Sequence, residues 1–148
     1  MRIVTHSAAE TERLGERVAG VLRGGEVLAL FGPMGMGKTA FTRGLARGLG
    51  VRGEVSSPTF ALIHEHAGKI PLYHFDMFRV TSWDDLYSTG FFDYLETGGV
   101  LVIEWSENIE GALPEDAVRI SVSRGASEDE RVFAFDGLAL PGEASADA

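Results

Sequence analysis

Residues 28–39 read LALFGPMGMGKT and match the pattern G-x-x-x-x-G-K-[ST] at every fixed position. Glycine lets the backbone approach an anion closely, so that several N–H groups can point at phosphate oxygens. The segment has three such glycines: Gly32, Gly35 and Gly37. Lys38 adds a mobile ammonium group, and Thr39 adds a hydroxyl that can bind magnesium. The pattern therefore predicts a loop that holds a nucleoside triphosphate.

The segments on either side of this loop have the composition of a buried strand and an amphipathic helix. Residues 26–31 form a short apolar run, which is typical of a strand in a parallel sheet. A helix that begins near Lys38 carries Phe41 and Leu45 four residues apart, and Gly50 is its expected C-terminal cap. Both flanks fit a P-loop, whose backbone at Met34 and Met36 would also face the phosphates.

The 148 residues carry a net charge of -9 and include no cysteine. This length fits a single domain, which we expect over residues 1–140, and the lack of cysteine excludes disulfides and thiolate metal sites. No signal peptide or membrane span is visible, so we expect a cytoplasmic protein without a membrane partner. The negative charge disfavours a whole surface that grips nucleic acid. Arg43 and Arg47 form either a local basic patch or a solvated helix face.

Two segments before and after the loop are less specific. Residues 2–5 predict a short strand, and the capping box that starts at Ser7 predicts a helix that ends at Gly24-Gly25. Beyond the loop helix, Ser57 and Thr59 flank a proline in a polar loop. Such hydroxyls can sense a γ-phosphate and its magnesium, as switch segments do, but the same composition is common in turns.

Two carboxylates end apolar strands downstream of the loop. Residues 70–76 predict a strand that ends at Asp76, where P-loop proteins hold magnesium, often through water. Residues 100–105 predict a central strand, and Glu104 lies at its end. At the carboxyl edge of the sheet, Glu104 can orient water or bind magnesium. The structural alternatives are an Asp76 that caps a turn and a Glu104 buried against an arginine or lysine.

The remaining pattern completes the fold. A helix is expected from residue 81 to the break at residues 97–99, with an aromatic cluster that belongs to the core or forms a partner surface. Residues 118–122 and 131–137 alternate and predict an antiparallel hairpin, and residues 141–148 predict a disordered acidic tail. We therefore predict an α/β P-loop NTPase-like fold of three layers, with a mixed, mostly parallel central sheet flanked by helices and closed by a C-terminal hairpin.

Four segments in this order and spacing resemble the bacterial TsaE family, also called YjeE. They are the P-loop, the S-P-T-F at residues 57–60, the Y-H-F-D-M-F-R at residues 73–79 and the I-E-W-S-E at residues 103–107. The resemblance extends from about Ser7 to Phe135. The chain departs from the family at Pro33 and Ala40, and at Phe78, where a tyrosine is usual.

The resemblance implies an ATPase that works with TsaD and TsaB to form threonylcarbamoyladenosine at position 37 of tRNAs that read codons beginning with A. It implies that Lys38 holds the β- and γ-phosphates of ATP, that Thr39 and the Walker B Asp76 serve Mg²⁺, and that Glu104 serves Mg²⁺ or water. Trp105 is the important aromatic beside Glu104 in this interpretation. The tRNA would be reached through the complex.

Two other functions use the same loop. A small-molecule kinase would pass a phosphoryl group to a bound acceptor, although the arginine-bearing lid of such enzymes is not apparent in the sequence. A nucleotide-gated binding module would dock a partner in its ATP-bound state without meaningful turnover. A phosphorylated product formed without a partner would identify the kinase.

Overall fold

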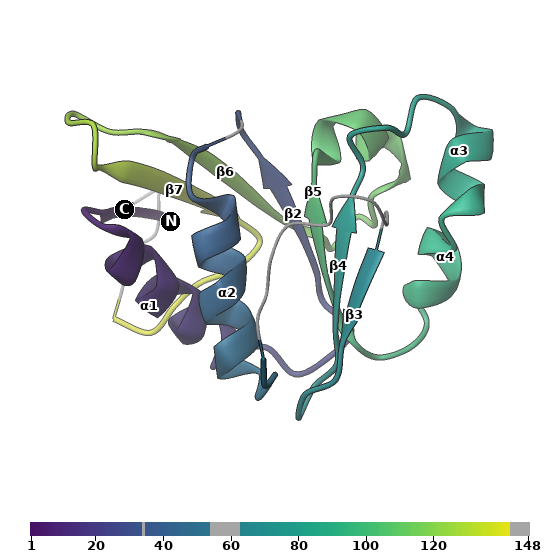
Figure 1. Ribbon diagram of the computed structural model, residues 1–148, viewed down its shortest axis with the longest axis horizontal. Coiled ribbons are helices and arrows are strands. Elements are labelled where there is room, and N and C mark those ends of the chain that lie inside the picture. Colours follow the sequence, from purple (N-terminus) through teal and green to yellow (C-terminus); the bar gives the residue numbers. More distant parts are fainter. Residues whose placement is uncertain (34, 54–62, 143–148) are drawn as a thin grey trace.

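The computed structural model describes residues 1–33, 35–53 and 63–142, so Met34, Ser57 and Thr59 lie outside the described residues (Figure 1). The strands are β1 (Arg2–Thr5), β2 (Val27–Phe31), β3 (Ile63–His66), β4 (Leu72–Asp76), β5 (Val100–Glu104), β6 (Val118–Arg124) and β7 (Arg131–Asp136). The helices are α1 (Ala8–Ala19), α2 (Lys38–Gly48), α3 (Trp83–Ser88), α4 (Phe91–Tyr94) and the 3-10 helix η1 (Ser106–Ala112). Among the described residues, no helix is long and apolar enough to cross a membrane.

The described strands form one mixed sheet in the order β1-β7-β6-β2-β5-β4-β3. The four strands β6, β2, β5 and β4 are parallel to one another. The strands β7, β1 and β3 join antiparallel, and β6 with β7 forms the predicted hairpin. The strand that leads into the P-loop thus lies in the middle of the parallel part, where ligands of open α/β sheets bind beyond the carboxyl ends.

Alternate residues of the central strands enter two cores, one on each face of the sheet. Leu28 and Leu30 of β2 pack with Phe41 of α2 in the first core, which also includes α1. Leu101 and Ile103 of β5 face the second core, together with α3, α4 and η1. Figure 1 shows α1 and α2 well separated from α3 and α4. The three-layer α/β prediction is confirmed.

The helices α1 and α2 pack unusually closely because glycines lie at their contact. A Cβ atom added at Gly44 would come within 1.8 Å of the Glu12 carbonyl oxygen, and one at Gly15 within 2.2 Å of the Phe41 carbonyl oxygen. Arg47 of α2 also donates hydrogen bonds to Glu12 and Glu16 of α1. Arg47 therefore lies on an exposed helix face, where it forms ion pairs with the neighbouring helix.

Two predicted helix ends were wrong. The first helix ends at Ala19 and not at Gly24-Gly25, because the Gly20 N–H closes the last turn and the chain continues in single turns up to Leu22. The helix expected over residues 81–97 is two helices, since Gly90 takes a left-handed φ of 78° and ends the first. The strands predicted at residues 2–5, 26–31, 70–76, 100–105, 118–122 and 131–137 are confirmed, as are the Ser7 cap and the break after α2. Ser7 Oγ accepts a hydrogen bond from the Glu10 N–H, and Gly50 has a φ of 81°.

Candidate nucleotide site

The P-loop joins the end of β2 to the start of α2, as the sequence predicted. Gly37 is the N-cap residue of α2 and has a φ of 92°, which a side chain would strain. Gly32 has a φ of 130°, and a Cβ atom there would lie 2.4 Å from the Val122 carbonyl oxygen. The backbone N–H groups at the start of α2 and the positive end of its dipole face the loop. The Met36 side chain packs against the core, so only its backbone can serve a ligand.

Lys38 is buried at the start of α2 and points into the loop. Its Nζ atom donates a hydrogen bond of 2.7 Å to the Gly32 carbonyl oxygen. The same Nζ lies 5.4 Å from the centre of the Trp105 ring, within the range of a cation–π contact. Trp105 is the only non-glycine residue with a positive φ among the described residues, at 59°. Such backbone strain is typical of functional sites, and here it turns the indole toward Lys38.

Glu104 ends β5 beside Asp76 of β4, because the two residues are register partners. Both lie at the carboxyl edge of the parallel strands, as predicted. Asp76 Oδ1 accepts a hydrogen bond of 2.9 Å from the Phe78 N–H, so this carboxylate also caps the turn after β4. Thr39 lies in the first turn of α2. Asp76 and Thr39 both carry oxygen atoms, the type of ligand that magnesium prefers.

Glu104 is buried, but its partner is not the arginine or lysine of the structural alternative. Its Oε2 atom lies 2.6 Å from Nε2 of His74, which is fully buried. The His74 Nδ1 atom has no hydrogen-bond partner among the residues that the structure describes. The pair fixes one carboxylate oxygen of Glu104 and so orients the whole group.

Sequence reasoning missed two contacts of this site. His74 precedes Asp76 by two residues in β4, so the period-2 alternation of a strand places both side chains on one face of the sheet. Glu104 of β5 lies on the same face, because it is the register partner of Asp76. This alternation could be recognised in the sequence, but the pairing of β4 with β5 could not. Glu107 of η1 accepts a hydrogen bond of 3.2 Å from the Gly32 N–H, and this contact needs the tertiary structure to be seen.

The surroundings of His66, the last residue of the edge strand β3, favour the neutral form of its side chain. Burial lowers the pKa of His66, and the nearby His74 and His64 lower it further. Its Nε2 atom is buried, and no residue in the described part of the chain forms a hydrogen bond with it. Within the described part of the chain, no three or more His, Asp or Glu side chains are grouped to hold a metal ion by themselves.

Comparisons with known proteins agree with this geometry. Residues 5–133 match the family model described as "Threonylcarbamoyl adenosine biosynthesis protein TsaE". The TsaE protein of Treponema pallidum is 43% identical over 122 residues, which cover 82% of this chain and 90% of that protein. The Bacillus subtilis TsaE protein is 39% identical over 132 residues, or 88% and 82% of the two chains.

A solved structure gives the same result. The crystal structure of Bacillus subtilis YdiB superposes with a TM-score of 0.73 at 34% identity, and the match covers 91% of this chain and 83% of that one. The family match over residues 5–133 includes the P-loop, Asp76 and Glu104. The chain belongs to the TsaE family.

Proposed function

We propose that this protein binds and hydrolyses ATP as a subunit of the assembly that forms threonylcarbamoyladenosine in tRNA. The relatives are named for the biosynthesis of this nucleoside. One observation supports the ATPase most strongly: the P-loop lysine, Lys38, lies against Trp105, the residue that follows Glu104. This contact supports a proposal in which the P-loop and the end of β5, where Glu104 lies, form one site. No finding favours the small-molecule kinase.

Each side chain has a role in this proposal. Lys38 would exchange its bond to the Gly32 carbonyl for the β- and γ-phosphates, whose charge it neutralises. Thr39 and Asp76 would hold Mg²⁺ together with phosphate oxygens, and the ion would stabilise charge on the transferred group. The Glu104 oxygen that does not face His74 would orient the attacking water. Ser57 and Thr59, outside the described residues, remain our predicted switch segment.

The partners and the compartment follow from the same role. TsaD and TsaB are the partner proteins that the family resemblance implies, and we expect the tRNA to be held mainly by them, because this chain has a net charge of -9. A subunit that acts on tRNA in such an assembly would work in the cytoplasm. Hydrolysis by the isolated chain is expected to be weak.

A pair of variants tests the assigned roles. Lys38→Ala removes the phosphate ligand, so we expect ATP binding to be lost. Glu104→Gln keeps the shape of the side chain but removes its charge, so ATP should still bind while hydrolysis falls by about 100-fold or more. Nucleotide binding by calorimetry and phosphate release in the presence of Mg²⁺ measure the two effects. Hydrolysis at the wild-type rate in Glu104→Gln would remove the catalytic role of this carboxylate.

A further inference from the structure

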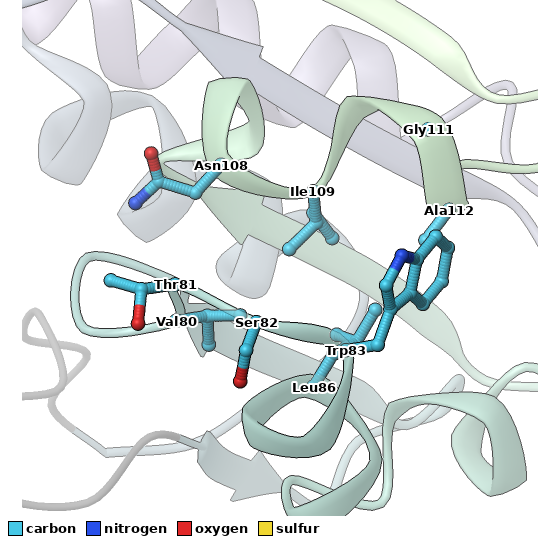
Figure 2. Close-up of a pocket in the computed structure, with 9 residues that line it drawn as sticks. All are labelled: Val80, Thr81, Ser82, Trp83, Leu86, Asn108, Ile109, Gly111 and Ala112. Carbon is cyan, nitrogen blue, oxygen red and sulfur yellow. The ribbon is translucent and has the colours of Figure 1, made fainter.

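A groove lies between α3 and η1, on the side of the second core. Figure 2 shows Ile109 of η1 and Leu86 of α3 facing each other across it, while the Trp83 ring stands beside Ala112 at one end. Val80 adds a further apolar side chain to the same wall as Leu86. Thr81, Ser82 and Asn108 add polar side chains to these apolar ones, and none of the lining residues belongs to the P-loop.

Aromatic side chains extend this groove along the surface. Trp83 and Tyr87 of α3 are 58% and 64% exposed, although both are large and apolar. Their ring centres lie 6.4 Å apart, and the Tyr87 ring lies 5.1 Å from that of Phe92. We call Trp83, Tyr87 and Phe92 the aromatic ridge. Exposed aromatic groups beside an apolar groove are typical of the centre of a protein–protein interface.

The charge around the ridge restricts what can bind there. Residues 80–97 contain four acidic residues and no lysine or arginine. Hydrogen bonds from Thr81 lower the pKa of Asp85, which keeps this carboxylate ionised. The phosphates of a tRNA, the acidic C-terminal tail and the same ridge of a second copy would all be repelled by these charges. An apolar protein segment flanked by lysine or arginine would be attracted.

The walls of the groove continue from the two strands that carry the predicted catalytic carboxylates. Val80 follows Asp76 of β4 by four residues, and η1 begins two residues after Glu104 of β5. Asn108 of η1 joins the walls, because its Nδ2 atom donates hydrogen bonds of 2.8 Å and 3.2 Å to the Met77 and Phe78 carbonyl oxygens. A partner in the groove therefore touches both segments that hold the nucleotide site.

We propose that the groove and the aromatic ridge dock an apolar segment, flanked by basic residues, of a protein partner in the modifying assembly. The inference rests on the proposed function, from which it takes the partner. The apolar segment fills the space between Leu86 and Ile109 and packs on the ridge, while its lysines or arginines face Asp84, Asp85 and Asp93. Docking in the groove would place the partner against the segments that directly follow the two carboxylate-bearing strands, β4 and β5.

Binding of the full chain to purified TsaD–TsaB complex tests this surface. The double variant Trp83→Ala, Tyr87→Ala should bind the complex about tenfold more weakly or worse, because interface aromatics carry much of the binding energy. Asp84→Asn with Asp93→Asn should weaken binding several-fold at low salt and reduce its salt dependence. Val4→Ala is the matched control, since Val4 is an exposed apolar residue of β1, outside the groove and the ridge.

The outcomes separate this inference from the proposed function. ATP binding and the unfolding temperature of the isolated variants should equal those of the wild type, because the changed side chains are exposed. If the alanine variant fails to fold, the exposed Asp84→Lys change carries the test and should also weaken binding. Wild-type affinity in these variants, or a wild-type self-association that Trp83→Ala abolishes, would overturn the docking proposal alone. A wild-type chain that never binds TsaD–TsaB would instead contradict the proposed function.

Discussion

The contact between His74 and Glu104 is the residue-scale feature that the proposed chemistry depends on most. Both side chains are buried, and a carboxylate that orients water must keep its position closely. The 2.6 Å contact from His74 Nε2 restricts Glu104 to one arrangement. We therefore assign His74 a positioning role, in which it acts through Glu104 without touching the nucleotide.

Substitution of His74 separates positioning from packing. His74→Leu removes the contact, so we expect the turnover number for ATP hydrolysis to fall by about 10- to 100-fold, since small displacements of a reacting group have effects of that size. The KM for ATP should change little, because the phosphate ligands that we propose lie in the P-loop. His74→Gln can still donate a hydrogen bond to Glu104 and should restore much of the rate. Equal loss in both variants would indicate a purely structural histidine.

His66 predicts a pH dependence of stability. Burial lowers its pKa in the folded chain, whereas the unfolded chain binds a proton near the ordinary value. Below about pH 6.5 the unfolded state therefore takes up more protons, and the free energy of unfolding decreases as the pH falls toward the lowered pKa. Urea unfolding between pH 8 and pH 5.5 should show a smaller decrease for His66→Gln than for the wild type. Equal slopes would contradict the effect of burial.

Individual site residues differ in how far the sequence predicts them. The P-loop residues from Gly32 to Thr39 are recognisable because their spacing along the chain is itself the site. Glu104 and Asp76 could be placed at the sheet edge because each ends an apolar run. The Glu104 partner could not be identified, since it depends on which strands are neighbours and in which register.

At the scale of elements, the packing of α1 on α2 positions the helix that begins the phosphate site. The helices approach through glycines, so their backbones touch where most helix pairs interpose side chains. Sequence patterns located both helices from their apolar spacing and from the Ser7 cap. They placed the end of α1 too late and missed the break at Gly90, because single glycines inside a helical pattern do not always end the helix.

Gly44→Ala tests this close approach. Alanine normally favours a helix over glycine by about 1 kcal/mol, but its Cβ atom would lie 1.8 Å from the Glu12 carbonyl oxygen. We expect the helices to be forced apart and the free energy of unfolding to fall by about 1–3 kcal/mol. Chemical denaturation measures the change. Gly111→Ala is the control, because no atom lies within 4 Å of the added Cβ, and its effect should stay within about 0.5 kcal/mol.

At the scale of the whole molecule, the sheet brings the P-loop, Asp76 and Glu104 to its carboxyl edge. The aromatic ridge lies on the face of the sheet that carries the second core. The class of fold and the closing hairpin were predictable, since they follow from strand and helix patterns. The order of strands and the antiparallel attachment of β3 were not predictable, because edge pairing depends on contacts between distant segments. The proposed ridge spans α3 and α4, which the sequence predicted as one helix.

The central claim is that ATP bound at Lys38 supports tRNA modification by the assembly. The most direct test mixes the purified chain with TsaD, TsaB, ATP, Mg²⁺, an unmodified tRNA and the threonylcarbamoyl donor, and measures threonylcarbamoyladenosine over several turnovers. We expect modification that depends on the wild-type chain and falls to the level of the mixture without it for Lys38→Ala. Modification that continues equally with Lys38→Ala, or that never depends on this chain, would contradict the account.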